Sequence, residues 1–204
     1  TQFHPEVSHT EKGNLIIHNF LFKIAQCQPN WTPENFISNQ IKTIRKLVGS
    51  NQVLVGVSGG VDSSVVAALV RKAVGDKMRA VLLDHGLMRK NEAEECRKFL
   101  KNGLGIEINL YDESEAFFSK LKGVTNPEKK RKIIGKQFID SFDRISNKQD
   151  NIKFLAQGTL YPDVIESGVS NSNKAHVIKS HHNVGGLPKE MKFQLIEPLR
   201  ELFK

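Results

Sequence analysis

The stretch Ser58–Ser64 carries the residue pattern with the clearest chemistry in this chain. It reads Ser-Gly-Gly-Val-Asp-Ser-Ser and follows the uncharged, β-branched run Val53–Val57. Two adjacent glycines let the backbone approach a ligand closely and point successive amide N–H groups toward it. Helical spacing begins at once, and a helix N-terminus attracts anions through its unpaired amides. The stretch therefore predicts a cradle for phosphate or pyrophosphate, built from Ser58, Gly59, Gly60, Val61, Asp62, Ser63 and Ser64.

The charge that balances those phosphates must come from elsewhere, because no lysine follows the glycines as it does in the P-loop. A carboxylate beside phosphates is repulsive unless a metal bridges them, so Asp62 predicts bound Mg²⁺. The alternative for Asp62 is a carboxylate that only favours the helix dipole. Asp163 and Glu166 are three residues apart and share a face if their segment is helical. A pair of this kind is commonly just a solvated helix face.

The elements that must position these residues alternate along the chain. The sequence predicts helices over 33–48, 61–74, 91–102, 113–121 and 127–145, and strands over 53–57, 78–83, 106–111 and 152–157. This order favours an α/β fold with a doubly wound parallel sheet. Ligands of such sheets bind beyond the carboxyl ends of the strands, where Ser58, Asp84 and Gly158 lie. We expect these three positions to converge on one site.

Three segments are expected in the domain organisation. Residues 1–26, with a helix over 15–25, resemble the end of a separate domain; residues 27–32 form a linker; and residues 33–204 form the main domain. Thr32 and Pro33 fit an N-cap followed by proline at the first helical position.

Composition narrows the functional class. The 204 residues carry a net charge of +8, which favours polyanionic partners such as nucleotides or nucleic acid. No apolar run approaches the roughly 18 residues needed to span a bilayer, so no membrane partner is expected. The two cysteines, Cys27 and Cys96, are widely spaced and are expected to be reduced, as in a cytoplasmic protein.

The motif at 58–64 resembles the signature of the N-type ATP pyrophosphatases, which cleave ATP between its α and β phosphates. Longer stretches resemble the GMP synthetase family within that group: residues 130–135, residues 155–167 and residues 178–188. The resemblance implies the adenine nucleotide alpha-hydrolase-like fold and a ligase that adenylylates xanthosine monophosphate and releases pyrophosphate. Ammonia, derived from glutamine, then yields GMP and AMP. ATP is the co-substrate and Mg²⁺ the cofactor.

The resemblance also implies roles for particular residues. It places Mg²⁺ on Asp62, Asp163 and Glu166, and makes Lys179 the cation that meets the phosphates. Leu83 lies where the family holds adenosine, and Arg131 matches a residue that meets the phosphate of the xanthine nucleotide; a surface charge is the alternative for Arg131. His181 and His182 lie in a segment that resembles a mobile lid. His85 departs from the asparagine that bacterial-type members carry, so no catalytic role is expected for it.

Residues 2–7 resemble the tail of a class I glutamine amidotransferase. There a cysteine attacks glutamine, a histidine takes its proton and a glutamate orients the histidine. His4 and Glu6 match the last two groups. The nucleophile has no match, because neither Cys27 nor Cys96 has flanking glycines.

The chain differs from the family pattern at both ends, which limits the activity expected of it. Most of the amidotransferase and the C-terminal dimerisation domain are expected to be missing, so the homodimer and the full reaction belong to the full-length enzyme. Two alternatives stay open: a tRNA-modifying ATP pyrophosphatase, favoured by the +8 charge, and a nucleotide-binding fragment without activity. The family resemblance favours no nucleic-acid partner.

Overall fold

A computed structural model describes residues 2–147, 151–167 and 192–203 of the chain, with the side chains of residues 166 and 167 left out. By its contacts the chain divides into units 1–39 and 40–204, a division that falls within one helix. The sequence-based boundaries at 26 and 32 stay predictions. Within the described residues no helix is long and apolar enough to cross a membrane.

The first unit consists of a turn-rich segment and two short helical pieces. Helix α1 spans Gly13–His18 and continues directly into the π-helix η1, Asn19–Ile24, where one helix over 15–25 was predicted. Helix α2, Pro33–Val48, begins in this unit with the predicted bounds. The Asn35 amide donates to Thr32 Oγ1 over 3.2 Å, which confirms the predicted cap.

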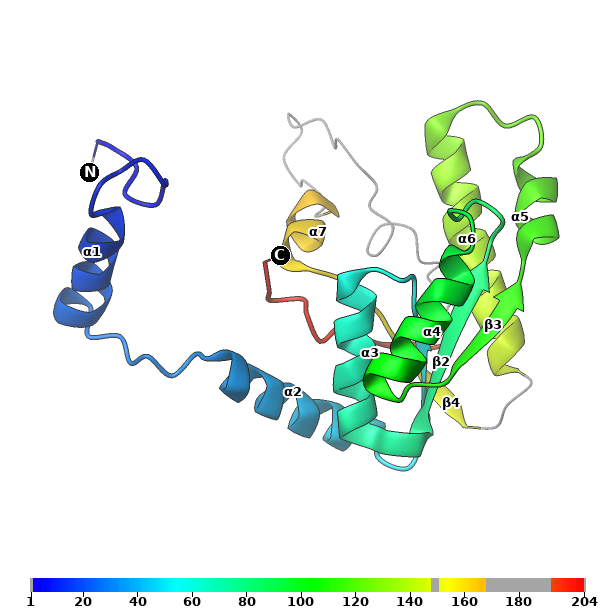
Figure 1. Ribbon diagram of the computed structural model, residues 1–204, viewed down its shortest axis with the longest axis horizontal. Coiled ribbons are helices and arrows are strands. Elements are labelled where there is room, and N and C mark those ends of the chain that lie inside the picture. Colours follow the sequence, from blue (N-terminus) through cyan, green and yellow to red (C-terminus); the bar gives the residue numbers. More distant parts are fainter. Residues whose placement is uncertain (1, 148–150, 168–191, 204) are drawn as a thin grey trace. The chain divides into compact units, whose positions relative to one another are not determined.

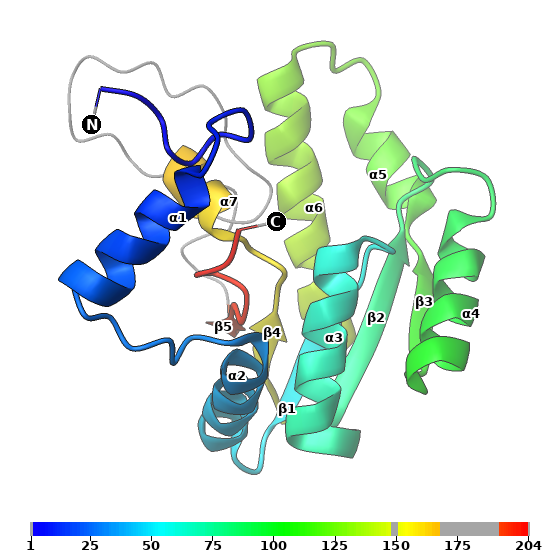
Figure 2. The same ribbon diagram turned by 60° about the vertical axis from the view of Figure 1, so that its left-hand side comes forward.

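The second unit is a five-stranded parallel sheet in the order β3-β2-β1-β4-β5. Its elements after α2 are β1 Gln52–Gly56, α3 Val61–Val74, η2 Gly75–Lys77, β2 Met78–Asp84, α4 Glu92–Leu104, β3 Ile108–Asp112, α5 Ser114–Leu121, α6 Pro127–Ser146, β4 Ile152–Ala156, α7 Tyr161–Ser167 and β5 Gln194–Ile196. Both views show α3 and α4 on one face of the sheet and α6 on the other (Figures 1 and 2). The predicted doubly wound parallel sheet is confirmed.

The core explains why the strand residues are apolar without alternation. Val53, Leu54 and Val55 of β1 are completely buried because helices cover both faces of the sheet. Leu54 belongs to a hydrophobic cluster in which residues of α6 pack against the sheet. The cluster is formed by Leu54, Val81, Leu83, Ile139, Phe142, Ile145, Leu155 and Phe193. Helix α6 is therefore anchored to the sheet along its second half.

The second unit also differs from the sequence prediction in several details. Helix α4 begins at Glu92, one residue after the predicted start, and Asn91 before it has a left-handed backbone, at φ 61°, and makes no side-chain cap hydrogen bond. The third strand begins at Ile108, two residues later than expected. Strand β5 was not predicted, because three residues are too short for a periodic signal.

Candidate functional site

The loop between β1 and α3 is held by its own serines. Ser63 Oγ accepts the Ser58 amide over 3.2 Å, lies 3.1 Å from Ser58 Oγ, and donates to the Gly60 carbonyl over 3.1 Å. Ser64 Oγ donates to the same carbonyl over 2.9 Å. These bonds hold the loop conformation, so all three predicted hydroxyls, those of Ser58, Ser63 and Ser64, have an internal role. Their role as phosphate ligands stays a prediction.

The start of α3 supplies the electropositive part of the site. Gly60 is the N-cap and offers no side-chain cap, and a helix leaves its first amides without intrahelical partners. Together with the helix dipole, these amides favour an anion at this point. Val61 follows with its side chain 68% exposed, so it contributes through its backbone rather than through packing.

Gly158 brings the end of β4 against that helix start. A Cβ added to Gly158 would lie 3.1 Å from the Asp62 carbonyl carbon and 3.2 Å from Asp62 Cβ, which is closer than ordinary side-chain contacts. The two strands that precede these segments, β1 and β4, are neighbours where the strand order reverses. Open α/β sheets bind ligands at this switch point, so the loop lies at the expected place.

A cavity of about 400 Å³ opens beside the loop. Its polar part is lined by Ser58, Asp62, Ser63 and Gln157, and its apolar part by Leu83, Met88, Ile134, Phe138, Ile139, Phe142 and Leu155. Ser58 and Gly158 line it as predicted. At the end of β2, Leu83 and His85 line it, while the Asp84 carboxylate accepts the Gly86 amide over 2.9 Å. A cavity with one polar and one apolar end suits a nucleotide.

Two buried polar atoms at the end of β4 have no partner among the described residues. They are Oε1 of Gln157, which lines the cavity, and Oγ1 of Thr159, whose residue is completely buried. A buried polar group without a partner is costly, and sites that bind ligands are one place where such groups occur.

An aromatic row lies along the apolar lining of the cavity: Phe138 and Phe142 line it, and Phe117 packs behind Phe138. Phe138 makes edge contact with Phe117 at 5.0 Å between ring centroids and stacks with Phe142 at 6.3 Å. His85 contacts both Phe117 and Phe138 at 5.7 Å, and its Nδ1 accepts the Leu87 amide over 3.1 Å. Sequence reasoning missed the residues of α6. Their spacing at 134, 138 and 142 places them on one helix face and could have indicated them.

Cys96 of α4 lies directly behind the loop. It is buried, and a Cβ added to Gly59 would lie 3.6 Å from its Sγ. Burial raises the pKa of this thiol, and the negative charge of Glu92 adds to the effect. Gly59 has φ 78°, which favours glycine, so the backbone conformation and the neighbouring thiol both restrict this position.

The predicted metal ligands lie within the described residues, whereas the predicted cation does not. Asp62 lines the cavity, and Asp163 Oδ2 accepts the Leu160 amide over 2.9 Å at the start of α7. Helix α7 puts residue 166 one turn after Asp163, as a shared face requires. Across the described ranges, no three His, Cys, Asp or Glu side chains gather as a metal site. Lys179, His181 and His182 lie outside the described residues.

Arg131 and the pair in the first unit make local contacts. Arg131 forms an ion pair with Glu128 in the first turns of α6 and does not line the cavity. His4 Nδ1 lies 2.8 Å from Glu6 Oε1, and both residues are exposed. The pKa of Glu6 is lowered by its own backbone amide and by the His4 hydrogen bond. The roles predicted for these residues stay predictions.

The chain has an adenine nucleotide alpha-hydrolase-like fold. The NH3-dependent NAD synthetase from Campylobacter jejuni has the same fold with a TM-score of 0.59 and 16% identity, over 68% of this chain and 61% of that one. A U34-tRNA thiolase from Methanococcus maripaludis matches with a TM-score of 0.56 and 20% identity, over 85% of this chain and 62% of that one. The chain belongs to the family described as NAD synthase, which it matches over residues 33–135, just over half of its length.

Similarity to GMP synthases is stronger and extends along the whole chain. The glutamine-hydrolyzing GMP synthase of Teredinibacter turnerae is 54% identical over 203 residues, and that of Symbiobacterium thermophilum is 57% identical over 203 residues. These residues are 100% of this chain and 39% of each relative, so the chain spans about two fifths of the proteins that it matches. The resemblance seen in the sequence motifs is confirmed.

Proposed function

We propose that this chain is the ATP-cleaving part of a glutamine-hydrolysing GMP synthase and activates xanthosine monophosphate. The observation that carries the proposal is the meeting of the loop 58–64, the start of α3 and Gly158 beside one cavity with an apolar wall. The phosphates would occupy the loop, and the adenosine would lie toward Leu83 and Phe138. The identity with GMP synthases over the whole chain selects this reaction among those of the fold.

The reaction has two steps. Oxygen O2 of the xanthine base attacks the α-phosphorus of ATP, the bond between the α and β phosphates breaks, and pyrophosphate leaves. Ammonia then attacks the activated carbon and displaces AMP, which gives GMP. The amides at the start of α3 stabilise the charge that develops on the departing pyrophosphate, because they are oriented before the reaction begins.

Other groups of the chain would complete the charge balance. Asp62, with Asp163 and Glu166, would hold Mg²⁺, which needs few carboxylates because phosphate oxygens and water fill its remaining positions. Bound Mg²⁺ neutralises charge on the pyrophosphate. Lys179 would supply a second cation, Arg131 would meet the phosphate of the xanthine nucleotide, and His181 and His182 would belong to a closing segment.

The first unit is proposed to belong to the amidotransferase that supplies ammonia. A glutamate that holds a histidine ring in one orientation is the arrangement such enzymes use, and the 2.8 Å contact between His4 and Glu6 supports that role. A homodimer of the full-length enzyme, the absence of a nucleic-acid partner and a cytoplasmic location remain predictions from the sequence.

The product of ATP cleavage tests the proposal. The protein is mixed with ATP, Mg²⁺, ammonium and xanthosine monophosphate, and the released phosphate species are identified. Pyrophosphate and AMP are expected, whereas ADP and inorganic phosphate would contradict the proposal. Asp62→Asn should reduce the rate at least about a hundredfold, as loss of a transition-state electrostatic contact does. If the chain alone turns over too slowly to measure, this substitution and its control are placed in a full-length relative.

Asp76→Asn is the matched control for Asp62→Asn. Asp76 lies beyond the other end of α3, where its carboxylate pairs with Arg71 over 2.7 Å on the surface. Removing this exposed charge should leave the rate unchanged, since exposed ion pairs contribute little. Equal losses in both variants would mean that the effect of Asp62→Asn is not specific to the site.

The net charge of +8 favours a second candidate, a tRNA-modifying enzyme. Filter binding of tRNA at low and moderate salt distinguishes the two functions, because non-specific electrostatic binding falls steeply with salt. Saturable tRNA binding that survives moderate salt would support the second candidate.

A further inference from the structure

Glu113 is a buried carboxylate outside the cavity that contacts the end of β2 and α6, which line the cavity, and α5, which packs behind them. It lies between β3 and α5, and only 6% of the residue is exposed. Neither the sequence motifs nor the proposed reaction use it. A buried carboxylate is expensive unless it is fully hydrogen-bonded, so its surroundings indicate what it holds in place.

The backbone of Glu113 connects β2 to α5. Its amide donates to the Asp84 carbonyl over 2.8 Å, next to His85 and Leu83. Its own carbonyl accepts the Phe117 amide over 3.1 Å, at the start of α5. The strand end that lines the cavity and the helix that carries Phe117 are therefore joined at one residue.

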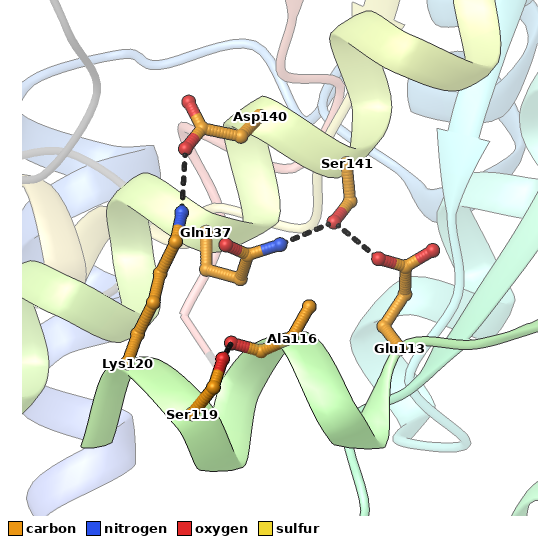
Figure 3. Close-up of polar contacts among 7 residues, drawn as sticks. All are labelled: Glu113, Ala116, Ser119, Lys120, Gln137, Asp140 and Ser141. Carbon is orange, nitrogen blue, oxygen red and sulfur yellow. Dashed lines mark hydrogen bonds and ion pairs between the residues drawn. The ribbon is translucent and has the colours of Figure 1, made fainter. Parts of the chain in front are cut away.

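The side chain of Glu113 connects both of these elements to α6. Ser141 Oγ donates to Glu113 Oε2 over 3.0 Å, and Arg144 forms an ion pair with Oε1. Gln137 Nε2 donates to Ser141 Oγ over 3.0 Å (Figure 3). The carboxylate accepts only, so the Ser141 proton must point toward it and Gln137 must be the donor behind. These buried hydrogen bonds therefore run in one direction, from Gln137 to Glu113, and they fix the rotation of α6.

The three elements that meet at Glu113 carry the aromatic wall, formed by His85 and Phe138 at the cavity, and the Phe117 ring that packs behind it. His85 follows β2, Phe117 is on α5 and Phe138 is on α6, and the three rings contact one another. We propose that Glu113 is a positioning residue for the nucleotide base: it sets the spacing of this wall without touching the nucleotide. The inference rests on the proposed binding of a nucleotide in this cavity.

Comparison of two ligands separates this role from general stability. AMP would contact the aromatic wall, whereas pyrophosphate would contact only the loop 58–64. Both dissociation constants are therefore measured by calorimetry on the same preparation. Glu113→Gln keeps the side-chain volume and removes the charge, and Ser141→Ala removes one donor. We expect the dissociation constant for AMP to rise about tenfold in Glu113→Gln, within the range of mutations that act at a distance. Ser141→Ala should show a smaller rise, and the constant for pyrophosphate should stay within about twofold.

Lys120→Gln is the matched control at the same pair of helices. Lys120 joins α5 to α6 through Asp140 over 3.1 Å, but both side chains are exposed (Figure 3). It should leave both dissociation constants unchanged.

Equal weakening of AMP and pyrophosphate in Glu113→Gln, or no change for either, would overturn the positioning role while leaving nucleotide binding intact. A wild-type protein that binds neither ligand would instead refute the proposed function, and this inference with it. Should Glu113→Gln fail to fold, the ratio of the two constants in Ser141→Ala decides the question.

Discussion

Gly158→Ala should disrupt the proposed phosphate site, because the added methyl group forces the end of β4 away from the start of α3. The added methyl group would lie 3.1 Å from the Asp62 carbonyl carbon, 3.2 Å from Asp62 Cβ and 3.3 Å from the Ser63 nitrogen. These are mostly backbone atoms at the start of α3, so no flexible side chain can move aside. Relief requires a shift of a few tenths of an ångström between β4 and α3, which costs about 1–3 kcal/mol, as overpacking does elsewhere.

The shift acts on the group that is proposed to bind phosphate. Amide hydrogen bonds weaken quickly with distance and angle, and those to charged groups contribute about 1.5–3 kcal/mol each. Loss of one such bond predicts a pyrophosphate dissociation constant raised at least about tenfold. Calorimetric titration with pyrophosphate measures this constant, and urea unfolding measures the expected loss of stability.

Gly103→Ala is the control for a methyl group on a glycine. A Cβ at Gly103 meets no atom within 4 Å, and the residue lies inside α4. Alanine there should raise the free energy of unfolding by up to about 1 kcal/mol through helix propensity and leave pyrophosphate binding unchanged. Wild-type affinity in Gly158→Ala would refute the proposed contact between the β4 end and the phosphate loop.

Two further predictions follow from titratable groups. Burial raises the pKa of Asp143, with Lys192 opposing the effect, so native protein takes up a proton more readily than unfolded protein and gains stability as pH falls through the native pKa. Asp143→Asn should therefore raise the urea midpoint at about pH 7 and reduce the stability gained on acidification toward about pH 4; an unchanged pH profile would contradict this cause. Burial also raises the pKa of the Cys96 thiol, whereas Cys27 is exposed, so a thiol reagent at about pH 8 should label Cys27 quickly and Cys96 only on unfolding. Mass spectrometry of the labelled peptides would detect rapid modification of Cys96, which would contradict the burial of its sulfur behind Gly59.

The parts of the fold that the sequence predicts are those with a local signal. The run 53–57 is uncharged and mostly β-branched, and Val53, Leu54 and Val55 in the middle of β1 are completely buried, because a strand covered on both faces favours apolar side chains. Helices α2 and α3 have their predicted bounds, since proline marks the first turn of one and the glycine pair precedes the other. Strand order carries no such signal. The positions of β4 beside β1 and of β5 at the edge depend on long-range packing alone.

The candidate site, like the fold, has parts with a local sequence signal and parts without one. The loop 58–64 is contiguous, so its glycines, its acid and its helix start are visible together in the sequence. The supports of that loop are distant in the chain: Cys96 lies behind Gly59 and Gly158 lies against Asp62. A lone cysteine in a charged stretch of helix gives no indication of such a contact.

The wall of the cavity shows why the second half of the site is hard to predict. The rings of Phe117 and Phe138 alone would be read as ordinary core, and the structure does bury Phe117 in that way. What distinguishes Phe138 is that it lines the cavity together with His85, which follows β2, while Phe117 packs behind both rings. A phosphate grip depends on backbone amides and can be encoded in seven consecutive residues. A wall that meets a base depends on the distance between separate elements, and here that distance is set by a buried carboxylate that touches no ligand. In the proposed site, phosphate recognition is therefore encoded mainly in one stretch of sequence, whereas placement of the base depends on the tertiary structure.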